Sequence, residues 1–198
     1  MAAPYTFKNI LDAAGAVVKM PFRQAGGTDL AHRPIHHSEV IVVQAEKTRP
    51  ADTTAYTAGD AIGDGASAVF TFDVGILGVP AGLIVGARFA RDVITDTGVR
   101  FRAEIHDAAP TTVPASDNAA GPILWANRAT RRGWIDFAAP IVGEATGSNC
   151  LEYAGLLSNV QGIPFSATDG ILRVLLTTRD AFTPAASKVS MVELDVVV

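Results

Sequence analysis

Three histidines that lie close together are the first residues of this sequence whose types and spacing suit chemistry. Imidazoles are common zinc ligands, and His32 and His36 stand four positions apart, which would place them on one face of a helix. Pro34 lies between them and would interrupt that helix, and the imidazole of His37 would point elsewhere. The pattern therefore favours a polar loop or a contact surface over a zinc site, and we expect no metal and no cofactor.

Cys150 is the only cysteine, so an intrachain disulfide is excluded and the chain suits a reducing compartment. A nucleophilic thiol needs a nearby base or cation that lowers its pKa. Residues 148–152 contain no His, Lys or Arg. We expect a small buried thiol or a neutral one, without a catalytic role.

Two stretches combine acidic residues with glycines, Gly59–Gly65 and Asp92–Gly98. A calcium loop needs several oxygen ligands at alternating positions and a final bidentate acid, and neither stretch reaches that density. Gly59–Gly65 also lacks the patterns of a P-loop and of a dinucleotide-binding turn. Both stretches are typical of turns in which Asp caps the backbone and Gly takes a positive φ. A catalytic triad or a pair of catalytic carboxylates is defined by its spatial arrangement, so scattered Ser, His, Asp and Glu residues do not indicate an enzyme. We therefore expect no enzyme and no catalytic residue.

One short basic cluster, Arg128, Arg131 and Arg132, lies between Trp125 and Trp134. Arginines and aromatic rings together could pair with and stack on nucleic acid, but the net charge is −4 and a single cluster is a small electrostatic footprint. We favour a solvated loop and expect no nucleic-acid partner. The two indole rings could also stack on a sugar, although a core position is the commoner use of tryptophan.

Short strands are the elements that must position these residues. Apolar or alternating segments are separated by clusters of Gly, Pro, Asp, Asn and Thr, as strands joined by surface turns would be. The predicted strands are Val69–Val74, Leu83–Arg91, Val99–His106, Trp134–Phe137, Ile171–Thr177 and Lys188–Val198.

Alternation is clearest in Val99–His106, where the odd-numbered residues are apolar and the even-numbered residues are charged or polar. We expect the first set to face a core and the second set, Arg100, Arg102, Glu104 and His106, to face water. Long helical patterns, which parallel strands would need for their crossovers, are absent between the segments. The sequence therefore predicts an all-β fold, an antiparallel β-sandwich of jelly-roll or Greek-key type.

The first 47 residues differ from the rest, because short apolar pieces such as Val40–Val43 are broken repeatedly by Gly and Pro. We expect an extended N-terminal arm over residues 1–47 and a β-sandwich domain over residues 48–198. Within the arm, Phe7–Met20 fits a short helix as an alternative to brief strands, since its apolar residues have helical spacing. We expect the arm to bind a partner, and the last strand, Lys188–Val198, to complete a sheet.

Apolar runs end well before the roughly 18 residues that a membrane-spanning helix needs. The first residues also lack the basic and then apolar pattern of a secretory signal. We therefore expect no membrane partner and synthesis in a cytoplasm.

Several stretches resemble virion structural proteins of tailed double-stranded DNA phages and phage-like particles. The resemblance lies in Thr48–Gly63 and Leu176–Ala185, with Asp169–Leu172, Asp117–Ala120 and Gly133–Trp134 between them. Together these stretches bracket the region from about residue 48 to the C-terminus. Pro50 predicts an extended backbone there, and Tyr56 and Phe182 are expected to anchor two turns on the core.

The resemblance implies a non-enzymatic protein on the capsid exterior, a decoration (cement) protein or the base of a head fibre. Its implied partner is the major capsid protein or another virion shell protein. Because shell-binding proteins commonly sit on symmetry axes, we also expect a homo-oligomer, most simply a trimer. Two alternatives stay open: a tail, spike or baseplate component that contacts host glycans, and a virion glycan hydrolase.

Overall fold

The computed structural model describes residues 6–11, 17–24, 32–34, 40–75, 81–93, 96, 98–121, 125–142 and 150–197. The chain divides into two compact units, Met1–Glu39 and Val40–Val198. The first unit contains an antiparallel three-stranded sheet in the order β1 (Thr6–Leu11), β2 (Val17–Gln24), β3 (His32–Pro34). The helix considered for residues 7–20 is therefore wrong. Ile10 pairs with Val18 across this sheet, and β-branched residues favour strands over helices.

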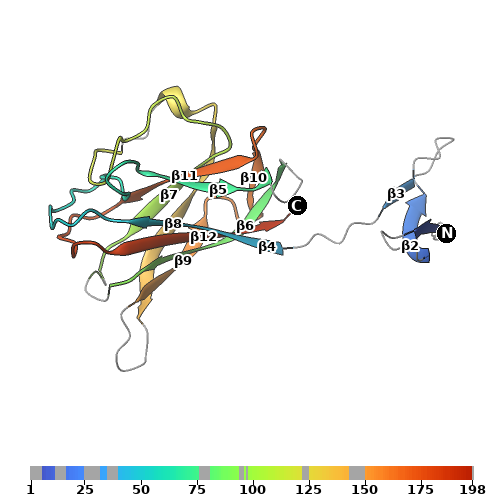
Figure 1. Cartoon of the computed structure of the whole chain (residues 1–198), viewed down its shortest axis with the longest axis horizontal. Coiled ribbons are helices and arrows are strands. Elements are labelled where there is room, and N and C mark those ends of the chain that lie inside the picture. Colours follow the sequence, from blue (N-terminus) through green and yellow to red (C-terminus); the bar gives the residue numbers. More distant parts are fainter. Residues whose placement is uncertain are drawn as a thin grey trace. The chain divides into compact units, whose positions relative to one another are not determined.

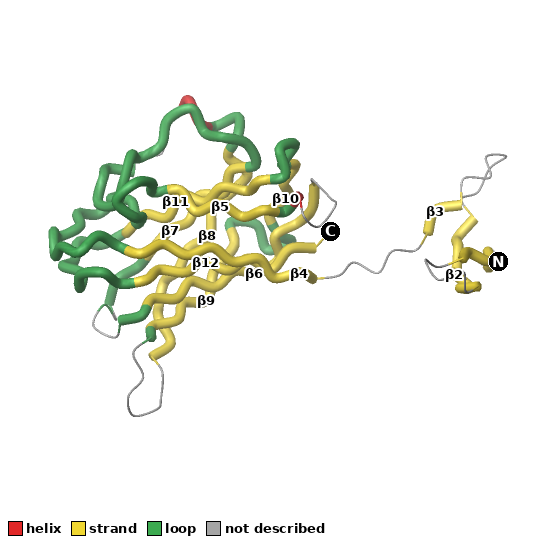
Figure 2. The backbone as a smooth tube through the Cα atoms, in the orientation of Figure 1, coloured by secondary structure: helices red, strands yellow, loops and turns green. Residues whose placement is uncertain are grey.

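The second unit is an antiparallel nine-stranded sheet, and the described residues contain no α-helix. A short 3-10 turn, η2 (Trp125–Asn127), lies in the long loop between β7 and β8 and is the red segment at the top of Figure 2. The strands are β4 (Val40–Thr48), β5 (Val69–Asp73), β6 (Ala81–Arg91), β7 (Phe101–His106), β8 (Arg131–Val142), β9 (Leu151–Leu157), β10 (Ile163–Ser166), β11 (Ile171–Thr178) and β12 (Val189–Val197).

The strands follow the order β4-β12-β6-β9-β8-β7-β11-β5, with β10 also paired to β6. The sheet curls until its two end strands, β4 and β5, contact each other, so it forms a nearly closed barrel that is also a flattened sandwich (Figures 1 and 2). Strands β6 to β9 are a Greek key, because β7, β8 and β9 are sequential neighbours and β6 lies beside β9. The predicted all-β antiparallel fold is confirmed.

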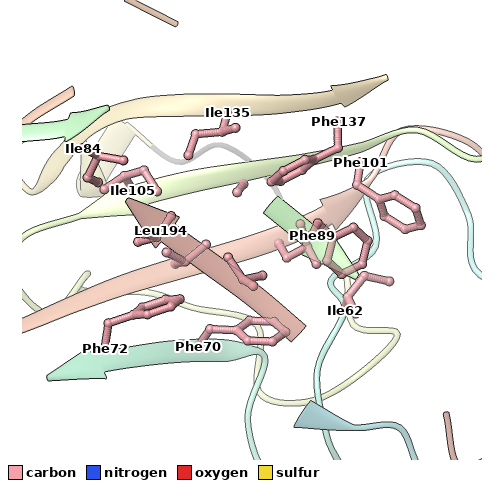
Figure 3. Close-up of a cluster of buried hydrophobic side chains, with 14 of the residues drawn as sticks. Ile62, Phe70, Phe72, Ile84, Phe89, Phe101, Ile105, Ile135, Phe137 and Leu194 are labelled. Carbon is pink, nitrogen blue, oxygen red and sulfur yellow. The ribbon is translucent and has the colours of Figure 1, made fainter. Parts of the chain in front are cut away.

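The interior of this sheet holds the larger of two hydrophobic clusters formed by the described residues, drawn in part in Figure 3. Several strands contribute alternate residues, as the two-residue period of a strand predicts. In β12, for example, Val192, Leu194 and Val196 are fully buried while the residues between them are half-exposed. Aromatic rings fill the centre: Phe89 contacts Phe101 with ring centroids 4.9 Å apart.

Strand β4 belongs to the sheet of the second unit. It pairs with β12 along its whole length, from Val40 opposite Val197 to Thr48 opposite Val189. The compact unit accordingly begins at Val40, whereas the sequence placed its division after residue 47. The apolar residues 40–43, which were expected to seek a partner, have one in β12 of the same chain.

All six predicted strand segments of the domain are strands in the structure. Two further strands, β9 and β10, were not predicted. Gly155 interrupts the pattern of β9, and Pro164 lies in β10, which pairs with β6 and with no other described strand. A glycine or a proline weakens the strand pattern in the sequence. In the structure, pairing with neighbouring strands stabilises the strand nevertheless.

The prediction that the even-numbered residues of β7 face water is partly wrong. Phe101, Ala103 and Ile105 face the core as expected, but Glu104 and His106 are also buried, at 6% and 1% exposed. The chain after β7 folds back over the end of the strand: the Asp107 amide donates to the Thr130 carbonyl, and His106 Nδ1 lies 3.0 Å from Thr130 Oγ1. A loop distant in sequence therefore covers part of the face that alternation assigned to water.

Candidate functional site

Three of the five stretches singled out in the sequence, Thr48–Gly63, Asp117–Ala120 and Leu176–Ala185, meet in space around one arginine. We call the group Arg49, Tyr56, Asp117 and Phe182 the Arg49 cluster. Arg49 lies over the Tyr56 ring, with 5.2 Å between the guanidinium carbon and the ring centroid. Tyr56 stacks on Phe182 on the core. The Tyr56 hydroxyl donates to Asp117 Oδ1 at 2.5 Å, so three separate stretches of the sequence converge on one group of side chains.

Arg49 is satisfied by several acceptors although it is almost fully buried. It donates to the carbonyl and carboxylate of Asp52 and to the Thr54 carbonyl, and its Nε lies 3.2 Å from Asp117 Oδ2. Burial by itself would lower the pKa of Arg49, but its bonds to Tyr56 and the charges of Asp117 and Asp52 outweigh burial and raise it. The arginine therefore stays charged and ties the turn that follows β4 to the Asp117 loop.

Burial also governs the two acidic groups of the cluster. It raises the pKa of the Tyr56 phenol, and the hydrogen bond to Asp117 raises it further. Burial likewise raises the pKa of Asp117, although the bonds from Tyr56 and from the Gly63 amide act in the opposite direction. The Tyr56 proton stays on the phenol and faces a carboxylate, so the arrangement is a structural lock and not an activated nucleophile.

A second buried pair lies close to the first. Arg91 is 1% exposed and forms an ion pair with Asp96. Its guanidinium carbon lies 5.7 Å from the Phe101 ring centroid and 5.3 Å from that of Phe182. The Tyr153 hydroxyl donates to the Asp96 carbonyl, and burial raises the pKa of Tyr153 to about 12. These polar groups connect turns to the core.

A surface pocket of about 180 Å³ opens on the outer face of β7 and β8. We call it the Trp134 pocket; it is lined by Arg102, Glu104, Arg131 and Trp134. Glu104 and Trp134 are directly opposite each other in the β7–β8 register. Trp134 is 41% exposed, so the expected core position is wrong for this residue. The side chain of Trp125 lies outside the described residues.

The basic cluster is not simply a solvated loop. Arg131 and Arg132 open β8, and only Arg128 precedes the strand. Arg132 forms an ion pair with the buried Asp107 at 2.5 Å, and Arg131 Nη1 lies 3.8 Å from Glu104 Oε2. Two of the three arginines therefore face carboxylates of their own chain, which lowers their capacity to neutralise phosphates.

The remaining candidates from the sequence occupy separate places. His32 opens β3, whereas His36 and His37 lie outside the described residues. Among the described residues, no group of three or more His, Cys, Asp or Glu side chains could hold a metal. The Cys150 thiol is half-buried, and burial followed by the charge of Glu152 raises its pKa, so the thiol is neutral at pH 7.

The Gly59–Gly65 turn follows the prediction. Gly59 has a φ of 97°, and Asp64 Oδ1 accepts hydrogen bonds from the Ala66 and Ser67 amides. In the second acidic stretch, Asp92 caps the Val189 amide at 2.7 Å. Gly98, however, is not among the glycines with positive φ, so that part of the expectation is wrong.

No helix among the described residues is long and apolar enough to cross a membrane.

Comparisons with known proteins yield no family assignment. No protein-family model and no curated protein matches the chain. A chain from the crystal structure of Israel acute paralysis virus aligns at 12% identity and a TM-score of 0.28, covering 100% of this chain and 94% of that chain. A chain from the structure of the Gt strain of infectious bursal disease virus aligns at 14% identity and a TM-score of 0.23, covering 96% of this chain and 40% of that chain. These TM-scores are too low to establish a shared fold or function.

The Trp134 pocket is the arrangement that sequence reasoning missed. Trp134 and the basic residues beside it were singled out, but Glu104 was assigned to a water-facing row. Only the β7–β8 register brings Glu104 and Trp134 together, and a long loop separates the two strands in the sequence.

Proposed function

We propose that this chain is a non-enzymatic structural protein of a tailed-phage or phage-like particle. In this role it binds the exterior of an assembled capsid as a decoration (cement) protein or as the base of a head fibre. Its partner is the major capsid protein or another shell protein, and the functional form is a homotrimer.

The Arg49 cluster is the observation that carries this proposal. The stretches that resemble virion proteins are far apart in the sequence, yet Arg49, Tyr56, Asp117 and Phe182 form one set of contacts. The resemblance therefore falls on residues that hold one architecture together. These contacts stabilise the domain and present no activated nucleophile, which supports a structural role over a catalytic one.

The proposed contact with the shell lies at β4 and the unit before it. Val40 and Val42 are each 55% exposed on β4, which is an end strand of the sheet. Exposed apolar side chains that lie together on one strand favour contact with another protein. We assign much of the attachment to this strand and to residues 1–39, which together match the arm expected from the sequence, although β4 belongs to the second unit.

A tail, spike or baseplate component that contacts a host glycan is the second candidate. The half-exposed Trp134 beside Glu104 favours it, because an aromatic wall and a carboxylate suit a sugar. A glycan hydrolase is the third candidate, and hydrolysis of a bound glycan would identify it.

The deciding experiment is labelling of intact particles. Antibodies against the full chain are applied to particles from the cells that encode it, followed by image reconstruction. We expect label on the capsid exterior at threefold positions. Label confined to the tail would support the second candidate, and particles without the chain would refute a virion role. Sedimentation equilibrium of the purified chain tests the trimer, and a monomer both in solution and on particles would refute it.

A further inference from the structure

The Trp134 pocket combines polar groups of both signs with one aromatic wall. On the outer face, Arg102 is opposite Asp136 and Glu104 is opposite Trp134 in the pairing of β7 with β8. Arg131 begins β8 and closes the pocket beside Glu104. Because both strands belong to a continuous sheet, these side chains are held on a rigid base, which favours a preformed site.

The charges around the pocket cancel. Arg102 binds Asp136 in a bidentate ion pair, with Nε to Oδ1 at 2.7 Å and Nη2 to Oδ2 at 2.8 Å. Arg131 faces Glu104. A phosphate or other anion would meet the buried Glu104, and a cation would meet Arg131. A neutral ligand with both donors and acceptors avoids either conflict.

Glu104 supplies the acidic group of the pocket. It is 6% exposed, and its ion-pair partners are Arg131 Nη1 and His106 Nε2, each 3.8 Å from Oε2. These distances exceed those of hydrogen bonds. Since Glu104 lines the pocket, ligand hydroxyls could donate to its carboxylate directly.

Trp134 supplies the apolar side of the pocket. The Arg102 guanidinium carbon lies 5.4 Å from its ring centroid and helps to fix the indole in place. The pocket volume, about 180 Å³, is below the roughly 300–1,000 Å³ typical of drug-sized ligands. The site therefore suits one small ring that has an apolar face and polar edges.

We propose that the Trp134 pocket binds one neutral sugar ring of a glycan, with the C–H face of the ring on Trp134 and hydroxyls donated to Glu104. Arg131 donates to a ring or hydroxyl oxygen of the same sugar. This inference goes beyond the proposed attachment to a shell and holds for a chain on the head or on the tail.

The test uses the full chain and saturation-transfer NMR, with titration of tryptophan fluorescence. The probes are the methyl glycosides of glucose, galactose, mannose and N-acetylglucosamine, with N-acetylneuraminic acid and glucosamine as charged comparators. We expect saturable binding of at least one neutral glycoside, and weaker binding of both charged comparators. Trp134→Ala and Glu104→Gln should each weaken that binding at least tenfold.

Leu156→Ala is the matched control, since Leu156 is 66% exposed on the neighbouring strand β9 but does not line the pocket. It should bind as the parent chain does. If Glu104→Gln does not fold, as judged by circular dichroism, Arg131→Gln replaces it and should show the same loss.

Three outcomes would overturn the inference: no binding of any neutral glycoside up to about 50 mM, binding unchanged in Trp134→Ala, or a preference for a charged comparator. Sugar binding is measured on the isolated chain, whereas attachment is measured on particles. A failure of one is therefore distinguishable from a failure of the other.

Discussion

The rings of Tyr56 and Phe182 stack with centroids 4.9 Å apart and an interplanar angle of 19°. Their backbones also form an isolated antiparallel bridge, in which the Tyr56 amide donates to the Phe182 carbonyl at 2.9 Å. The two residues lie in the first and last of the stretches that resemble virion proteins. This contact joins the turn after β4 to the turn before β12, and both strands are neighbours in the sheet.

Replacement of Phe182 by alanine should destabilise the domain by about 3 kcal/mol, because the ring contacts both Tyr56 and Phe101 and its loss leaves a cavity. Urea unfolding followed by circular dichroism measures the free energy of unfolding. Val160→Ala is the control: Val160 is 98% exposed, so its loss should change stability by less than about 0.5 kcal/mol. Equal effects of the two substitutions would contradict the anchoring role.

Tyr56→Phe keeps the stacked ring and removes only the hydroxyl. That hydroxyl donates to Asp117 and accepts from Arg49, so its loss should cost about 1–3 kcal/mol. Tyr153→Phe is the matched comparison, because the Tyr153 hydroxyl donates to a neutral backbone carbonyl. We expect the larger loss at Tyr56, since hydrogen bonds to charged groups are stronger. A larger loss at Tyr153 would argue against the structural lock.

Arg91→Met should destabilise the domain by about 3–5 kcal/mol, because it leaves the buried Asp96 carboxylate without this ion-pair partner. Adding Asp96→Asn to the same chain should recover part of the loss, since the buried negative charge is then gone. A double-mutant cycle in urea measures the coupling between the two sites. Additive losses would show that the two residues act independently.

Arg100 and Asp180 make the stability of the domain sensitive to acid. The hydrogen bond from the Arg100 side chain, with that from its backbone amide, lowers the pKa of Asp180 from 3.8 to about 2. A lowered pKa in the folded state contributes stability that is present above pH 3.8 and is lost as the pH falls through about 2. The pair is partly exposed, so the effect is small.

Asp180→Asn should therefore lower the urea midpoint relative to the parent chain above pH 4, and the difference should shrink toward pH 2. An NMR titration of the Asp180 carboxyl gives its pKa directly. The effect of Asp117 on stability has the opposite pH dependence. Burial raises the pKa of Asp117, so its contribution to the stability of the folded state is lost as the pH rises through the folded-state pKa. An ordinary pKa for Asp180 would contradict the geometry of the pair.

The boundary between the two units can be tested with two shortened chains. Residues 40–198 should fold cooperatively, because this unit retains β4 and its pairing with β12. Residues 49–198 lose β4 and expose the edge of β12, so we expect lower stability and aggregation. Thermal unfolding and light scattering measure both. Equal behaviour of the two chains would mean that β4 is dispensable.

Local pattern was sufficient for the six predicted strands of the domain and for the Gly59–Gly65 turn. The alternation of apolar residues predicted β7 and β12, and the Asp and Gly residues predicted the Gly59–Gly65 turn. These features depend on neighbours one to four residues away, which the sequence displays directly. The local spacing of apolar residues also suggested a helix over residues 7–20. The structure has strands there, because β1 pairs with β2.

The sequence by itself determined an antiparallel all-β protein whose last strand builds a sheet, because the two-residue period and the turn residues are local properties. Only the tertiary structure decided which strands are neighbours. It placed β4 against β12, brought Thr130 of a distant loop against His106, and set Glu104 opposite Trp134. The register across a long loop depends on the fit of the whole core, and no short stretch of sequence records that fit.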